Sequence, residues 1–112
     1  KKGDMVRAAQ AGRESVRIFP ENADNLSNLA YWLLVRNDSI GEALGYAEKA
    51  VAMVPNHPMY LWTRGLVLEK AGKRRKALAS MELALKYLDL FPDGRIYYQA
   101  DLLKDIGRVR GR

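Results

Sequence analysis

The apolar residues of this sequence recur at the three- and four-residue spacing of one helix face. Two such sets stand out: Leu26, Leu29, Ala30 and Leu33 in the first, and Leu61, Arg64, Gly65 and Leu68 in the second. Two further helices are expected at about residues 41–54 and 74–90, which are rich in the good helix formers Ala, Leu, Glu and Lys. No stretch alternates apolar and polar residues as a strand does. The pattern therefore predicts an all-α fold.

Small residues and prolines repeat along the chain with a period of about 35 residues. Four sets keep this spacing: Ala8, Ala43 and Ala77; Ser15, Ala50 and Ala84; Ala30, Gly65 and Ala100; and Pro20 with Pro55. A small residue lets two helices joined by a short turn approach closely, whereas a larger one would overpack the seam at about 1–3 kcal/mol. Each period therefore predicts one pair of closely packed helices.

This period divides one domain of residues 1–112 into four parts. Residues 1–20 are expected to form the second helix of a truncated repeat, and residues 21–55 a complete repeat. Residues 56–92 are expected to form a complete repeat whose second helix is extended and runs to Phe91. Residues 93–112 are expected to form a helix that either caps the stack or begins a further repeat, followed by a basic tail.

The two complete repeats resemble the signature of the tetratricopeptide repeat family. The motif positions are Leu61-x2-Arg64-Gly65-x2-Leu68 with Ala77-x3-Met81-x2-Ala84, and Leu26-x2-Leu29-Ala30-x2-Leu33 with Ala43-x3-Ala47-x2-Ala50-x4-Pro55. One departure is an extra residue in the turn after the first helix of the earlier copy. The resemblance implies a right-handed superhelix of stacked antiparallel helix pairs, an α-solenoid. It also implies a non-catalytic scaffold that binds a peptide or helix of a partner protein in its concave groove.

In that family the first helix of each pair lines the concave side, which here assigns a set of candidate partner-binding residues. They are Ser27, Tyr31 and Leu34 in one repeat, and Met59, Trp62, Leu66, Glu69 and Lys70 in the next. Apolar and aromatic residues dominate this face, so it forms either a recognition groove or a packing surface inside the stack. Some family members bind C-terminal carboxylates through cations on this face. Here Lys70 is the only cation at the matching positions, so an apolar or amphipathic ligand suits the face better.

The formal net charge of +6 raises a second candidate function. Its densest cluster is Lys73-Arg74-Arg75-Lys76, at the start of a predicted helix. This cluster is either a solvated turn or a patch for an anionic partner such as RNA or an acidic protein. Nucleic acid is the less favoured partner, because the basic residues gather at a turn and at the chain ends and do not line the groove.

Enzyme chemistry finds little support in the sequence. The absence of cysteine excludes thiol catalysis, disulfides and thiolate metal sites. The single histidine, His57, lies in a predicted connection, where we expect it to be exposed and inert. Asp101 and Asp105 stand one helical turn apart among cations, which is typical of surface ion pairs. We therefore expect no catalytic residues, no metal and no cofactor.

Two expectations concern the setting of the chain. No apolar run approaches the roughly 18 residues that a membrane span needs, and a cytoplasmic location is the best guess. The first helix would lack its repeat partner, which leaves Val6, Ala9, Val16 and Phe19 partly uncovered. Two chains could cover each other there, so a homodimer through the N-terminal helix is a further hypothesis.

Overall fold

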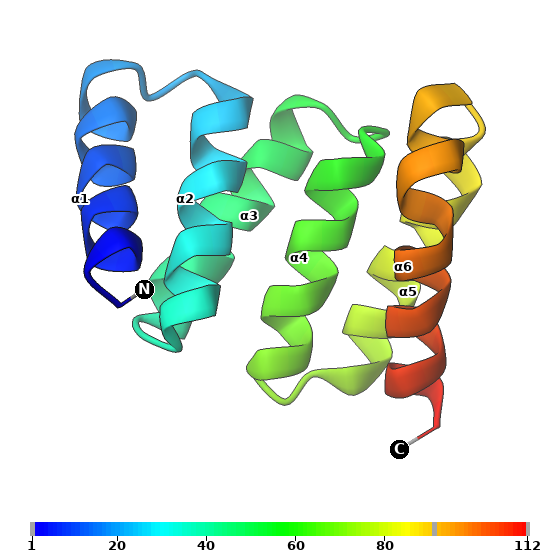
Figure 1. The fold of residues 1–112 in the computed structure, drawn as a ribbon. Coiled ribbons are helices and arrows are strands. Elements are labelled where there is room, and N and C mark those ends of the chain that lie inside the picture. Colours follow the sequence, from blue (N-terminus) through cyan, green and yellow to red (C-terminus); the bar gives the residue numbers. More distant parts are fainter. Residues whose placement is uncertain (1, 91, 112) are drawn as a thin grey trace.

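In the computed structural model, which describes residues 2–90 and 92–111, the chain is all-α, as predicted. Within those ranges the six helices are α1 (Lys2–Ile18), α2 (Ala23–Arg36), α3 (Ile40–Met53), α4 (Pro58–Lys70), α5 (Arg74–Leu88) and α6 (Pro92–Arg110). Consecutive helices run in opposite directions and are joined by short turns (Figure 1). None of the described residues lies in a strand.

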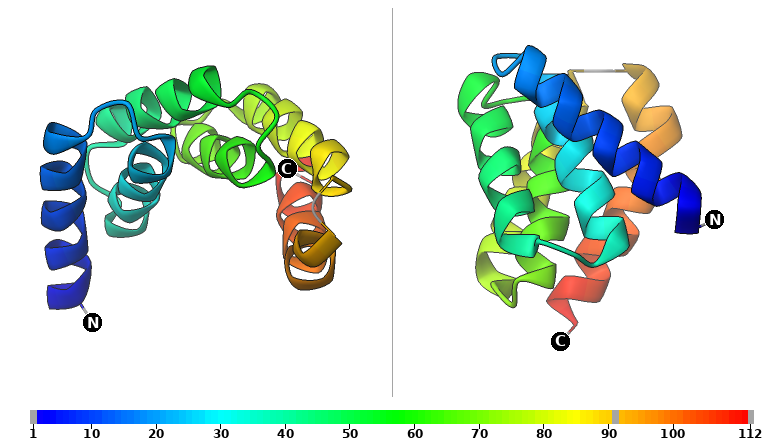
Figure 2. Two further views of the ribbon diagram at one scale, coloured as in Figure 1. Left: turned by 90° about the horizontal axis from the view of Figure 1, so that it is seen from above. Right: turned by 90° about the vertical axis from the view of Figure 1, so that its left-hand side faces the viewer.

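The helices pack mainly against their neighbours in sequence. Each helix contacts the next one along the chain, and α2 also contacts α4. Seen from above, they follow an arch, with α3 and α5 on its outer side and α2 and α4 on its inner side (Figure 2, left). The first and last helices stand at the two ends of the arch and enclose the space beneath α2 and α4.

Local sequence explains where the two inner helices begin. The side chain of Asn22 accepts a hydrogen bond from the Asn25 backbone N–H at 3.0 Å and so caps α2. At the start of α4, His57 Nδ1 accepts from the Met59 N–H at 3.2 Å, and Pro58 occupies the first turn, where no N–H is needed. His57 is half-buried, so the expectation that it is exposed is wrong.

The extra residue of the first repeat lies in the turn between α2 and α3, which has an unusual backbone. Asn37 and Ser39 both take left-handed conformations, each with φ of 54°. In the equivalent turn between α4 and α5, only Gly72 has a positive φ among the described residues, at 81°. An extra residue therefore requires a second left-handed position, and the chain fills it with serine, which adopts this region at some energetic cost.

The last connection differs from the expected one. The sequence predicts that the second helix of residues 56–92 runs to Phe91, but α5 ends at Leu88 and the Leu90 N–H bonds to the Tyr87 carbonyl in a turn. Phe91 itself lies outside the described residues. Proline has no backbone N–H to donate, so a helix that starts before Pro92 does not continue through it. That proline instead opens α6.

The small residues of the two complete repeats lie in the core, as predicted. The alanines Ala30, Ala43, Ala50, Ala77 and Ala84 are fully buried. A Cβ atom on Gly65 would lie 2.7 Å from Met81 Cγ and 3.2 Å from the Ala77 carbonyl oxygen, so α4 and α5 approach too closely there for a side chain. Ala100 occupies the position in α6 that matches Ala30 and Gly65 in the earlier repeats. It is exposed, because the described residues include no helix that packs on that side of α6.

The N-terminal helix is better covered than expected. Ala9 is fully buried and belongs to a core cluster with Leu29 and Leu33 of α2. The expectation that Ala9 is partly uncovered is therefore wrong, because α2 packs across it. Val16 is half-buried, whereas Phe19 is 59% exposed. The side chain of Val6 lies outside the described residues.

Candidate functional site

A groove of about 590 Å³ lies between α2, α4 and α6. We call it the central groove. It is lined by Asp24, Ser27, Asn28 and Tyr31 of α2, by His57, Met59, Tyr60, Trp62, Thr63 and Leu66 in and before α4, and by Tyr98, Asp101 and Asp105 of α6. A second hollow of about 540 Å³, the end groove, is lined by Leu34, Leu66, Glu69, Lys70 and Arg108. Leu66 lines both.

The structure places all eight sequence-predicted partner-binding residues on these two grooves. Ser27, Tyr31, Met59, Trp62 and Leu66 line the central groove, while Leu34, Leu66, Glu69 and Lys70 line the end groove. Ser27 is buried with 6% exposure, whereas Tyr31 is 43% exposed. The predicted face is thus one connected set of groove-lining side chains, with Ser27 its most enclosed member.

Trp62 both packs inside the fold and lines the central groove, two positions that the sequence analysis treated as alternatives. Its ring is half-buried and packs against the core, yet it also lines the central groove. Its Nε1 donates a hydrogen bond to Asp105 Oδ2 at 2.8 Å, and Tyr98 meets the ring edge-on at a centroid distance of 6.4 Å. Trp62 therefore links α4 to α6 while it forms part of the groove surface.

An ion-pair network also holds α6 against α4. Arg108 donates to both carboxylate oxygens of Glu69, at 3.0 and 2.6 Å, and to Asp105 Oδ1 at 2.5 Å. The hydrogen bonds that Arg108 donates to Glu69 and then to Asp105 raise its pKa above the ordinary value. The predicted surface ion pair is confirmed for Asp105 with Arg108. Together with the Trp62 bond, this network fixes the α6 wall of the central groove.

The α2 wall is positioned by a second polar contact. The Tyr60 hydroxyl donates a hydrogen bond to Asp24 Oδ1, and the His57 ring stacks on the Tyr60 ring at 3.9 Å. Burial, followed by the hydrogen bond to Asp24, raises the pKa of Tyr60 above its ordinary value of 10. The phenol is therefore held in its neutral form. Tyr31 stands further along this wall, edge-on to Trp32 at 5.8 Å.

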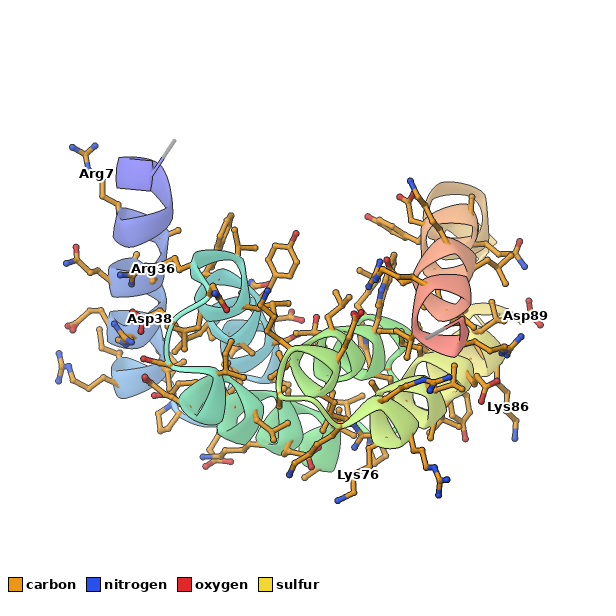
Figure 3. All side chains as sticks on the ribbon, turned by 90° about the horizontal axis from the view of Figure 1, so that it is seen from below. Arg7, Arg36, Asp38, Lys76, Lys86 and Asp89 are labelled. Atoms are coloured by element: carbon orange, nitrogen blue, oxygen red, sulfur yellow. The ribbon has the colours of Figure 1, made fainter. Side chains whose placement is uncertain are left out.

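The predicted basic patch does not form one open cationic surface. Arg74 donates to the backbone carbonyls of Val109 and Arg110 at 2.9 and 2.8 Å, so its guanidinium caps the end of α6. Lys73 and Lys76 line a different hollow together with Glu48 and Arg64, and Arg75 is exposed. Lys76 points to the outer side of the arch, away from the space between α1 and α6 (Figure 3).

The acidic and aromatic residues of α6 were missed as candidate site residues. Asp101 and Asp105 follow Leu66 and Lys70 by 35 residues, so extending the repeat by one period would have placed them on the groove face. Asp24 precedes Met59 by 35 residues, so the same period would have placed it on this face as well. Tyr98 carries no comparable signal, because the angle of α6 decides its position.

Comparisons with models of known protein families and with curated proteins find no match to this chain. Among the described residues, no helix has both the length and the apolar character needed to cross a membrane. In the same part of the chain, no three His, Cys, Asp or Glu side chains gather so that they could hold a metal ion. Any functional assignment therefore rests on the repeat pattern and on the grooves.

Proposed function

We propose that this chain is a non-catalytic scaffold that holds a peptide or single helix of a partner protein in the central groove. The observation that supports this most is the chemistry of the groove surface. Tyr31, Met59, Trp62, Leu66 and Tyr98 all border an open hollow, although apolar side chains usually avoid water. Concave apolar surfaces with a few polar groups are the usual form of a binding site.

The arrangement of the helices supports a tetratricopeptide-like α-solenoid as the framework. Helix pairs that repeat about every 35 residues pack in sequence order along an arch. Arrays of this kind bind extended or helical segments on their inner surface. A hollow of about 590 Å³ accommodates a few side chains of such a segment, which suits a peptide better than a folded domain.

A peptide-display experiment tests this proposal. A library of random peptides is panned against the purified chain, and enriched peptides are synthesised and titrated by fluorescence anisotropy. Tyr31→Ala should weaken binding by about 30-fold, since truncating an aromatic residue central to an interface costs about 2 kcal/mol. Its helical circular dichroism should stay unchanged, because Tyr31 is largely exposed.

The matched control removes an exposed apolar side chain outside both grooves. Leu103 lies on α6 and is 47% exposed, so Leu103→Ala should leave the affinity unchanged. Equal binding by the wild-type chain and Tyr31→Ala, or failure of the panning to enrich any peptide, would remove the central groove as the binding site.

The alternative, a module for an anionic partner, is less well supported by the positions of its cations. Arg74 is engaged with the end of α6, and Lys76 lies on the opposite side from the central groove. A labelled single-stranded RNA should therefore show only weak binding that disappears at moderate salt. Tight binding that is lost in a Lys73→Gln, Arg75→Gln, Lys76→Gln triple variant would favour the alternative.

A further inference from the structure

The central groove has the opposite charge to the rest of the chain. Its lining includes Asp24, Asp101 and Asp105, and none of the described residues that line it is Lys or Arg. The whole chain carries a formal net charge of +6. A locally negative, partly enclosed surface on a basic protein attracts cations and repels anions, because low-dielectric walls concentrate the field.

The acids stand on both walls of the groove. Asp24 lies on α2, whereas Asp101 and Asp105 lie on α6, and the apolar residues of α4 lie between them. Asp105 is already bonded to Arg108 and to Trp62, and Asp24 accepts one bond from Tyr60. Asp101 is exposed and Asp24 is also exposed, so both keep carboxylate oxygens accessible to a ligand. The acids do not form a metal-binding cluster.

The aromatic rings make the same surface suitable for cationic side chains. Tyr31, Trp62 and Tyr98 border the groove, and the faces of such rings attract ammonium and guanidinium groups. The methylene stems of Lys and Arg pack on apolar surface while their charged ends reach nearby carboxylates. A groove with an apolar middle and acidic walls therefore matches a segment that is itself both apolar and basic.

From this complementarity we infer that the partner segment is a basic amphipathic peptide, whose apolar side chains lie on α4 and whose Lys or Arg side chains reach Asp24 and Asp101. The inference rests on the proposed function and adds the charge of its partner. In the end groove, which shares Leu66 with the central groove, Arg108 pairs with Glu69 and Lys70 adds one cation, so this lining has no excess of acids. The basic residues of the segment should bind at the Asp24 and Asp101 end of the two grooves.

The test starts from an enriched display peptide, which is made in three forms with Lys, Gln or Glu at every polar position. The Lys form should bind about tenfold or more tighter than the Gln form, and added salt should reduce this difference. Asp24→Asn and Asp101→Asn should each weaken the Lys form by about two- to fivefold and leave the Gln form unchanged. Asparagine still accepts the bond from Tyr60, so Asp24→Asn preserves that wall. Glu82→Gln, which removes one acid from α5, should have no effect.

The outcomes separate the two proposals. Equal binding of the Lys and Gln forms, both weakened by Tyr31→Ala, would overturn the charge inference and leave the proposed function in place. Tightest binding of the Glu form would also overturn it. If Tyr31→Ala binds all three forms as tightly as the wild-type chain does, both the charge inference and the proposed function are overturned. If the chain alone self-associates in light scattering, and Asp101→Asn abolishes this, the occupant is a second copy and the inferred partner is wrong.

Discussion

The contact between α4 and α5 at Gly65 gives the sharpest test of the packing. Gly65→Ala adds one methyl group, which has two opposing effects of known size on the free energy of unfolding. In a helix interior, Gly→Ala stabilises by about 0.8–1 kcal/mol through backbone entropy. In this chain the added Cβ would lie 2.7 Å from Met81 Cγ and 3.2 Å from the backbone carbonyl oxygen of Ala77. Met81 is fully buried, and its Cγ is not the free end of the side chain, so it has little room to move. Overpacking of this kind costs about 1–3 kcal/mol. We therefore expect Gly65→Ala to destabilise the fold by up to about 2 kcal/mol net.

Gly45→Ala is the matched control, since Gly45 lies within α3 and a Cβ there would meet no atom within 4 Å. This variant should stabilise by about 1 kcal/mol, and urea unfolding followed by circular dichroism measures both changes. In a Met81→Ala background the penalty of Gly65→Ala should shrink, because the closest contact is gone. If Gly65→Ala stabilises the chain as much as Gly45→Ala does, the close approach of α4 and α5 is wrong.

Two further predictions follow from the turns and from the buried tyrosine. Ser39→Gly should stabilise the chain by about 0.5–1 kcal/mol net. Glycine adopts the left-handed conformation without the steric cost that serine has, and this gain is partly offset by the greater entropy of glycine in the unfolded chain. Ser39→Ala should not stabilise, because alanine keeps the steric cost. Urea unfolding measures both variants, and equal effects would contradict the backbone assignment. For Tyr60, the folded pKa is raised above 10, so its contribution to stability is present below pH 10 and is lost as the pH rises through the folded pKa. Stability of the wild-type chain should therefore fall above pH 10 more steeply than that of Tyr60→Phe, and identical pH profiles would contradict the burial of this phenol.

Much of the fold was predictable because it depends on local side-chain size. The alanines at Ala43, Ala50, Ala77 and Ala84 are buried where the period places them, and the helices of the two complete repeats follow the predicted order. The ends were harder to predict, because they depend on which helix lies next to them. Ala9 is buried through its contact with α2, a pairing that the repeat pattern did not assign to it.

The candidate site was predictable only on the helices whose period is clear. Tyr31, Trp62 and Leu66 line the central groove because they stand on one face of α2 or α4, which helical spacing reveals. The α6 wall depends on side-chain bonds across the fold, such as Trp62 with Asp105 and Glu69 with Arg108. Spacing within one helix carries no information on such bonds. The same applies to Arg74, whose role at the end of α6 depends on the angle between two helices.

The central claim is that the surface shared by α2, α4 and α6 holds a partner segment. Nuclear magnetic resonance of the isotope-labelled chain tests it most directly, by titration with an enriched display peptide and assignment of the backbone amides that shift. The account predicts that the largest shifts lie around Tyr31, Trp62, Leu66 and Asp101, with little change along α3 and the outer face of α5. Shifts centred on α3 and α5, or on Lys73 and Lys76, would contradict it.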